Sequence, residues 1–151
     1  METTHKHLIS CDIRPSVHRI ALMKYLEEHR THPTVDKIFE DLHPALPTLS
    51  KTTIYNTLKL FAEKGAIQII TIYAKNARFD ADTKTHAHFQ CSRCGMVFDV
   101  PIMAFPQVSE QDMADFDIQD TQVYFRGICP KCKNECEKSA VSGHERTLKQ
   151  N

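Results

Sequence analysis

Two pairs of cysteines, each with two residues between its members, constrain this chain more than any other feature. The first pair is Cys91 and Cys94, and the second is Cys129 and Cys132. Two intervening residues let one tight turn direct both sulfurs at a single ion, and two such turns complete the tetrahedral four-sulfur site that suits zinc. The spacing therefore predicts a structural zinc site that contributes to the folding of the second half of the chain. Redox-active dithiols are the alternative.

The other cysteines lack such a partner. Cys11 stands alone and is expected to be a small buried apolar side chain, while Cys136 is either a bystander or an alternative ligand. The first residues, METTHKHLIS, do not resemble an export signal, and no apolar run approaches the roughly 20 residues needed to cross a membrane. We therefore expect a cytoplasmic protein without membrane association, whose thiols stay reduced and bind metal.

Charge is unevenly distributed, although the formal net charge is zero. Residues 51–78 contain five basic residues and one acid, whereas residues 107–120 contain five acids and no base. A local positive surface is sufficient for contact with nucleic-acid phosphates, which would repel the acidic stretch. The two halves of the chain are therefore expected to have different tasks.

Three amphipathic helices are expected in the first half, with Ser16, Thr34 and Ser50 as their N-caps. Apolar side chains follow each cap at helical spacing: Val17, Ile20, Ala21, Met23 and Leu26 in the first helix, Val35, Ile38, Phe39 and Leu42 in the second, and Ile54, Leu58 and Phe61 in the third. Gly65 is the expected end of the third helix. Residues 67–73 and 78–82 are predicted strands, joined by a turn at 74–77.

The third helix carries a polar face that suits DNA. Its members, opposite the apolar side, are Lys51, Thr52, Tyr55, Asn56 and Lys59. Three helices followed by a hairpin are the order of a winged helix-turn-helix domain, in which the third helix enters the major groove. A solvated face on a small helical bundle is the alternative.

The pattern changes near residue 83. Short β-prone runs follow at 86–91, 96–100 and 121–128, with a weaker helical stretch near 106–114. The predicted fold class is α+β, with an N-terminal winged helix-turn-helix domain over 1–82 and a hinge over 83–85. A C-terminal α/β domain with the four-cysteine zinc site is expected over 86–136, and a disordered tail over 137–151.

Histidines and acids predict a second metal site. His86 and His88 have one residue between them, so strand alternation would point both imidazoles to the same side. Asp80 and Asp99 could add oxygen ligands, and His32 precedes the second helix. Such a mixed nitrogen and oxygen set suits iron(II), manganese(II) or zinc(II). Packing or solvent-exposed histidines are the alternative.

In their order along the chain, these residues resemble the ferric uptake regulator (Fur) family. The resemblance covers roughly residues 12–132 and rests on His32-Pro33-Thr34, Ser50-x-x-Thr53-Ile54-Tyr55-Asn56-x-Leu58, Arg78-Phe79-Asp80, His86-x-His88, Cys91-x-x-Cys94-Gly95 and Cys129-x-x-Cys132. It implies that the C-terminal α/β domain is a dimerisation domain, and that the homodimer represses transcription by binding a palindromic operator when metal is loaded. It also implies a regulatory ion between the two domains, with His32, Asp80, His86, His88 and Asp99 as ligands.

Within that family the chain is most similar to the peroxide-responsive PerR subgroup. Asp99 stands where other members have glutamate, and Ala87 and Thr121 stand where iron and zinc sensors carry a further metal site. The resemblance implies regulatory iron(II) or manganese(II), with His32 and His86 as the histidines open to oxidation by peroxide.

One departure from the family precedes the first predicted helix. His18 replaces a glutamine there, although Arg14 and Arg19 remain and are expected to contact DNA phosphates.

Three other functions stay open. An iron or zinc sensor without peroxide chemistry belongs to the same class. A small zinc enzyme using His86, His88 and a bound water is disfavoured, because the chain has neither HExxH nor an HxE paired with PCxxC. A zinc-ribbon interaction module without DNA binding is the third. We expect a regulator rather than an enzyme.

Overall fold

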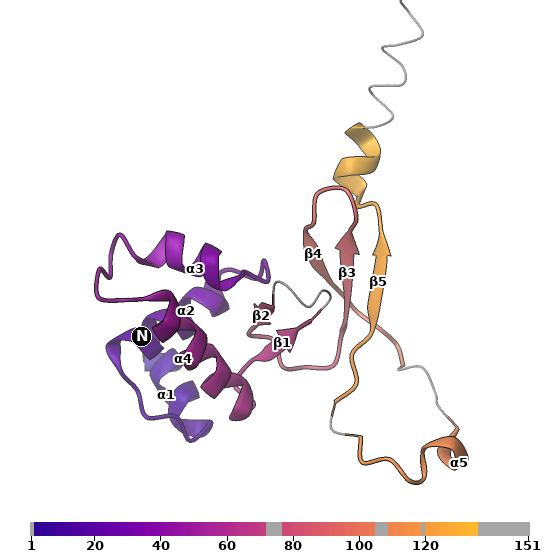
Figure 1. Ribbon diagram of the computed structural model, residues 1–151, viewed down its shortest axis with the longest axis horizontal. Coiled ribbons are helices and arrows are strands. Elements are labelled where there is room, and N and C mark those ends of the chain that lie inside the picture. Colours follow the sequence, from indigo (N-terminus) through magenta and orange to yellow (C-terminus); the bar gives the residue numbers. More distant parts are fainter. Residues whose placement is uncertain (1, 72–76, 105–108, 119, 136–151) are drawn as a thin grey trace, which may run out of the picture. The chain divides into compact units, whose positions relative to one another are not determined.

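The computed structural model describes residues 2–71, 77–104, 109–118 and 120–135 (Figure 1). The chain divides into two compact units, of which the first ends at Lys84 and the second begins at Thr85. This boundary falls within the stretch that the sequence assigns to a hinge. The predicted turn at 74–77 falls largely outside the described residues, and Cys136 and the predicted tail over 137–151 fall wholly outside them.

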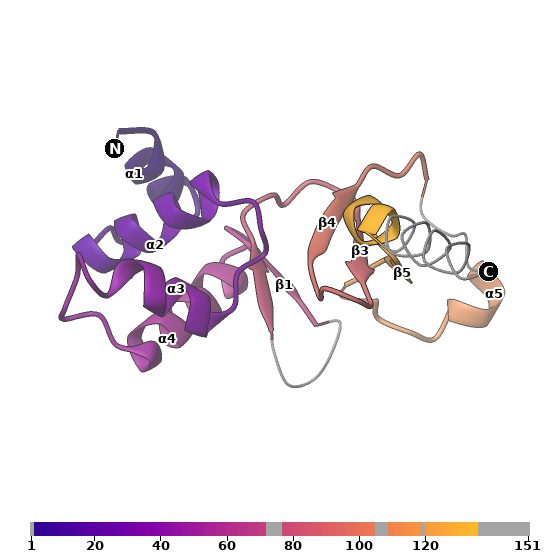
Figure 2. The same ribbon diagram turned by 90° about the horizontal axis from the view of Figure 1, so that it is seen from above.

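The first unit combines helices with a two-stranded hairpin (Figures 1 and 2). Its described elements are α1 (Glu2–Ser10), α2 (Val17–Glu28), α3 (Val35–Leu42), α4 (Lys51–Glu63), β1 (Gln68–Ile70) and β2 (Arg78–Asp80). The strands are antiparallel, with Gln68 opposite Asp80. The order from α2 to β2 is the predicted order of a winged helix-turn-helix domain, whereas α1 was not predicted.

Each predicted helix begins where its capping residue places it. The side chains of Ser16, Thr34 and Ser50 accept hydrogen bonds from the backbone N–H three residues later, at 3.4, 3.3 and 3.1 Å. At the end of α4, Gly65 takes a φ of +67°, and the N–H of Ala66 bonds to the carbonyl of Phe61 at 2.8 Å. This closing turn is a Schellman motif, which needs a left-handed residue and so favours glycine.

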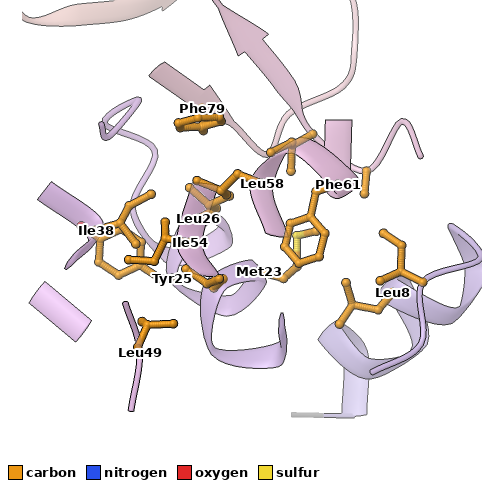
Figure 3. Close-up of a cluster of buried hydrophobic side chains, with 14 residues drawn as sticks. Leu8, Met23, Tyr25, Leu26, Ile38, Leu49, Ile54, Leu58, Phe61 and Phe79 are labelled. Carbon is orange, nitrogen blue, oxygen red and sulfur yellow. The ribbon is translucent and has the colours of Figure 1, made fainter. Parts of the chain in front are cut away.

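The core of the first unit confirms most of the predicted inward side chains. Ile54, Leu58 and Phe61 of α4 have no exposed surface, and they lie beside Met23 and Leu26 of α2 (Figure 3).

The prediction for α2 needs three corrections. Val17 is 70% exposed because it occupies the first residue of the helix, whereas Leu22 and Tyr25, which were not assigned to the core, are buried. Helix α2 buries a wider face than predicted because α1 also packs against it.

The second unit is built on a three-stranded sheet with the order β4-β3-β5. Strand β3 (Ala87–Cys91) pairs antiparallel with β4 (Val97–Val100) and parallel with β5 (Tyr124–Gly127). Helix α5 (Glu110–Met113) is the described part of the predicted helical stretch, and residues 130–135 are also helical. Helices and a sheet together confirm the α+β class. No helix in the described ranges has the length and apolar character to span a membrane.

Candidate functional site

The structure brings the four predicted zinc ligands together. The sulfurs of Cys91, Cys94, Cys129 and Cys132 all lie within 4.8 Å of one another. Cys91 ends β3, and Gly95 closes the first turn with a φ of +72° and an N–H bond to the Cys91 carbonyl at 2.9 Å. The sulfurs of Cys94 and Cys129 are 3.9 Å apart. This spacing is close to the edge of a ZnS₄ tetrahedron, about 3.8 Å for Zn–S bonds of about 2.3 Å.

Three side-chain and backbone contacts, none predicted from the sequence, join the two cysteine turns. Arg93 donates from Nη1 to the Cys132 carbonyl at 2.9 Å, and Ser92 Oγ donates to the Gly127 carbonyl at 2.8 Å. The Cys129 N–H points at Cys91 Sγ, 3.3 Å away. The first turn is therefore fixed to both β5 and the helical residues 130–135, which aligns the two cysteine pairs.

The thiols differ in how readily they ionise. Backbone N–H donors, first that of Cys129, lower the pKa of Cys91 to about 6. Burial, followed by hydrogen bonding to the neighbouring thiols, raises the pKa of Cys132 to about 12. Four thiolates in so small a volume repel one another unless a cation compensates their charge. A divalent ion that prefers thiolate satisfies this donor set, and zinc fits it.

The second unit also carries a compact group of two histidines and one carboxylate. His88 lies opposite Asp99 in the antiparallel pair of β3 and β4. His86 precedes the strand by one residue, which corrects the prediction that both histidines lie within it. The Nε2 atoms of His86 and His88 are 3.0 Å apart, and Asp99 Oδ1 lies 3.3 and 3.8 Å from them. Three donor atoms thus converge on one point.

The first unit holds the two other predicted regulatory ligands side by side. His32 Nε2 lies 3.6 Å from Asp80 Oδ2, and their side chains are 1% and 3% exposed. The other carboxylate oxygen, Oδ1, accepts the Asp82 N–H at 2.9 Å, which directs Oδ2 toward the imidazole. A buried imidazole and a carboxylate at this separation form a pair that a divalent ion can join.

His32 adopts a left-handed backbone, with a φ of +50°, and β2 holds it there. Arg78 donates from Nη1 to the His32 carbonyl at 2.9 Å, and the Phe79 N–H bonds to the Pro33 carbonyl at 3.2 Å. Within the run Arg78-Phe79-Asp80, the sequence predicted a role only for Asp80, as a metal ligand. Its first two residues position the turn that carries His32.

Tyr124 is a neighbour of the histidine pair that the sequence did not indicate. It lies beside His88 in the parallel register of β5 and β3, and their rings stack with centroids 5.9 Å apart. The sequence shows only a β-prone run around Tyr124, and such a run does not indicate which side chain the tyrosine ring will contact.

The proposed DNA-contacting residues of α4 all lie at the surface. Lys51, Thr52, Tyr55, Asn56 and Lys59 are exposed. Lys51 also has partners within the unit, since its Nζ donates to Asp36 at 2.6 Å and lies 5.5 Å from the centre of the Phe39 ring. Ahead of α2, Arg14 is exposed and Arg19 half-buried, with Arg19 Nη1 donating to the Arg14 carbonyl at 2.8 Å. Cys11 is half-buried against the core, not fully buried as expected.

Comparisons with known proteins agree on one family. The model of the ferric uptake regulator family matches residues 3–133. The peroxide-responsive repressor PerR of Staphylococcus epidermidis (strain ATCC 12228 / FDA PCI 1200) is 34% identical over 140 residues, which cover 89% of this chain and 91% of that protein. PerR of Staphylococcus aureus (strain Mu50 / ATCC 700699) is also 34% identical, with 89% and 93% coverage.

A solved structure shows the same fold at lower identity. The ferric uptake regulator of Vibrio cholerae superposes with a TM-score of 0.65 at 18% identity, covering 83% of this chain and 98% of that one. The family match spans both units, and the curated relatives are regulators of transcription. The chain therefore belongs to the ferric uptake regulator family and is a metal-responsive transcriptional repressor, not an enzyme.

Proposed function

We propose that this repressor responds to peroxide through a regulatory ion, iron(II) or manganese(II), held by His32, Asp80, His86, His88 and Asp99. The observation that carries the proposal is the convergence of His86, His88 and Asp99, whose donor atoms lie within 3.8 Å of one another. The buried pair of His32 and Asp80 supplies the same kind of donors from the first unit. Similarity to peroxide-responsive repressors along most of the chain supports this branch of the family.

We assign a different role to the four-cysteine cluster. Its all-sulfur donor set selects zinc over iron(II) or manganese(II), and it is the closed type of site that stabilises folds. A structural zinc ion would remain bound while the regulatory site gains and loses its own metal. The two sites thus separate folding from sensing.

The DNA contact is assigned to the exposed face of α4. In winged helix-turn-helix domains the helix in the position of α4 enters the major groove, which supports this assignment, and Arg14 and Arg19 would add phosphate contacts. The proposed contact residues on α4 are Lys51, Thr52, Tyr55, Asn56 and Lys59. A palindromic operator follows from two copies of such a surface in a dimer.

The second unit has the apolar surface that a dimer needs. In the register of the sheet, Phe98, Phe89 and Phe125 lie in one row across β4, β3 and β5, and Phe98 and Phe125 are 40% and 47% exposed. Ile128, which follows β5, is 48% exposed. Exposed aromatic rows of this kind mark protein contact surfaces, which supports dimerisation through this unit.

In the proposed mechanism, peroxide destroys one of the ligands of the regulatory ion. His32, Asp80, His86, His88 and Asp99 would hold iron(II), which would supply the redox chemistry that cleaves the O–O bond of hydrogen peroxide. One oxygen enters a C–H bond of an imidazole and the other leaves as water, so the histidine loses two electrons and gains one oxygen atom. We assign this oxidation to His32 or His86. An oxidised imidazole is a poorer ligand, which would release the ion and end repression.

The test measures DNA binding and oxidation in one sample. A duplex is first selected from a random pool by the zinc-replete, iron(II)-loaded protein, and its binding is followed by fluorescence anisotropy before and after a low dose of hydrogen peroxide. Mass spectrometry then examines the His32 and His86 peptides. Loss of binding with a gain of one oxygen on either peptide supports the proposal, and the zinc-replete protein without a regulatory ion is the control whose histidines should stay unmodified.

The alternative within the family gives a different result. Binding that requires the metal but survives peroxide, with unmodified histidines, would identify a metal-homeostasis repressor.

A further inference from the structure

We infer that Asp82 is a positioning residue of the proposed regulatory site, which holds the Asp80 carboxylate and the chain beyond it in place before an ion binds. Asp82 is not itself among the described residues whose donor atoms converge as possible ligands. The inference rests on the proposed function, since Asp80 is a metal ligand only in that proposal, and it adds a residue that acts through Asp80.

The connector between the two units is short and has a proposed ligand at each end. Asp80 and His86 are separated by residues 81–85, and the boundary after Lys84 falls among them. An ion that takes ligands from both units must fix whatever freedom this connector has, and fixing a backbone costs conformational entropy. The order that the connector has before the ion binds therefore affects the affinity for the ion.

Two successive turns order the start of this connector. Asp80 Oδ1 accepts the Asp82 N–H at 2.9 Å, and Asp82 Oδ1 accepts the Lys84 N–H at 3.0 Å. Each carboxylate thus binds the backbone two residues further on, which is the Asx turn that aspartate and asparagine form. Asp82 belongs to both turns, because it donates its N–H in the first and accepts with its side chain in the second.

The two turns together determine where the Asp80 carboxylate points. While Oδ1 is bound to the Asp82 N–H, Oδ2 lies 3.6 Å from His32 Nε2. The second turn restrains the backbone of Asp82 and so fixes the direction of that N–H. Loss of the Asp82 side chain would open the second turn and leave the first one, together with the proposed ligand, less restrained.

The ligands of the second unit have support of another kind. His88 and Asp99 face each other across the paired strands β3 and β4. Asp80, in contrast, is the last residue of β2, where pairing with β1 ends at Gln68. Strand pairing therefore restrains the Asp80 backbone on one side only, and the two turns continue the order into the connector.

The charge of Asp82 is a weaker candidate for the same role. Arg30 Nη1 lies 3.9 Å from Asp82 Oδ2, and the Arg30 side chain is 71% exposed. Ion pairs with this exposure contribute little, because solvent screens them. We therefore assign the role to the hydrogen bond that closes the second turn, and variants that lose only the charge can test this choice.

The test compares Asp82→Ala with Asp82→Asn in binding manganese(II) alone. Both variants remove one negative charge, but asparagine keeps an oxygen that can accept the Lys84 N–H. Titration of the zinc-replete proteins, followed by the electron paramagnetic resonance of free manganese(II), should show about fivefold weaker binding by Asp82→Ala than by Asp82→Asn. This factor is of the order of the entropy cost of fixing one backbone residue. Thr83→Ala, at an exposed position of the same connector, is the control that should keep wild-type affinity.

A second measurement needs no regulatory ion. In the zinc-replete protein, the Lys84 amide should exchange with deuterium about fivefold faster in Asp82→Ala than in Asp82→Asn, because only alanine leaves that N–H without its acceptor. Arg30→Gln should leave the exchange rate unchanged, since it removes only the exposed ion pair. Thermal melting of each variant shows whether the fold is kept.

The possible failures can be told apart. If Asp80→Ala binds manganese(II) as tightly as the wild type, the proposed ligand set fails and the inference falls with it. If Asp80→Ala weakens binding but Asp82→Ala and Asp82→Asn bind manganese(II) equally, only the inference is overturned. Faster exchange at Lys84 in Asp82→Ala without weaker binding would also overturn it, and would limit the role of Asp82 to the connector.

Discussion

Replacement of Lys59 by alanine should change the salt dependence of DNA binding while leaving the fold intact. The Lys59 side chain is 62% exposed, and its Nζ lies 3.8 Å from a Glu63 carboxylate oxygen, one turn further along α4. An exposed pair of this kind contributes about 0.3–0.5 kcal/mol. Alanine is a slightly better helix former, so the free energy of unfolding should change by less than about 0.5 kcal/mol.

The effect on DNA binding should be far larger than the effect on stability. Each phosphate contact adds about 0.9 to the slope of log K against log salt, so loss of one contact in each protomer of a dimer lowers the slope by about 1.8. Between 50 and 200 mM salt, the affinity ratio of wild type to Lys59→Ala should therefore shrink by about tenfold. Fluorescence anisotropy titrations at four salt concentrations measure both slopes.

Lys24 offers a closely matched control on α2. Its side chain is 50% exposed and its Nζ lies 3.6 Å from Glu28, again one turn along the helix. Lys24→Ala should therefore change stability as little as Lys59→Ala does, but keep the wild-type salt slope. Equal slopes for all three proteins would refute a contact between Lys59 and a DNA phosphate, and equal losses in both variants would indicate a general effect of net charge.

Three further predictions concern stability and metal. Leu58→Ala, at a fully buried position, should cost about 2–5 kcal/mol in urea denaturation, more than Leu60→Ala at a half-buried one. The hydrogen bond from Lys37 lowers the pKa of Asp41 below its ordinary 3.8. The ionised carboxylate therefore stabilises the fold above about pH 4, and this stabilisation is lost as the pH falls through the lowered pKa. In Asp41→Asn, the free energy of unfolding measured in denaturation curves should fall less steeply at acid pH. Cys132→Ser should reduce zinc content measured by atomic emission and lower the protection of second-unit amides in hydrogen exchange, whereas unchanged zinc would contradict the four-sulfur site.

The parts of the fold that follow from local chemistry could be predicted from the sequence. A cap needs only a hydroxyl and a free N–H three residues later, and Ser16, Thr34 and Ser50 all meet that condition. Strand alternation likewise predicted that the imidazoles of His86 and His88 point to the same side, although the start of β3 was predicted one residue too early.

Helix α1 could not be predicted, because its docking depends on a residue far along the chain. Thr4 Oγ1 donates to one oxygen of Glu27 at 2.7 Å, and His7 Nδ1 lies 3.0 Å from the other. Leu8 is fully buried, but Ile9 is 56% exposed, so α1 has too narrow an apolar face for a periodicity argument. The ion pair of Lys51 with Asp36 was missed for the same reason, since it joins residues 15 positions apart on different helices.

His32, a proposed ligand of the regulatory ion, has a strained left-handed backbone. Among the described residues other than glycine, only Asp12 and His32 have a positive φ. Asp12 follows a helix end and is exposed, whereas His32 is fully buried, and a left-handed backbone at a residue other than glycine costs on the order of 1–3 kcal/mol. Arg78 and Phe79 hold the strained turn by hydrogen bonds to the carbonyls of His32 and Pro33. The strand that supplies Asp80 therefore also fixes the imidazole beside it, so the two proposed ligands are positioned by one element before any ion binds.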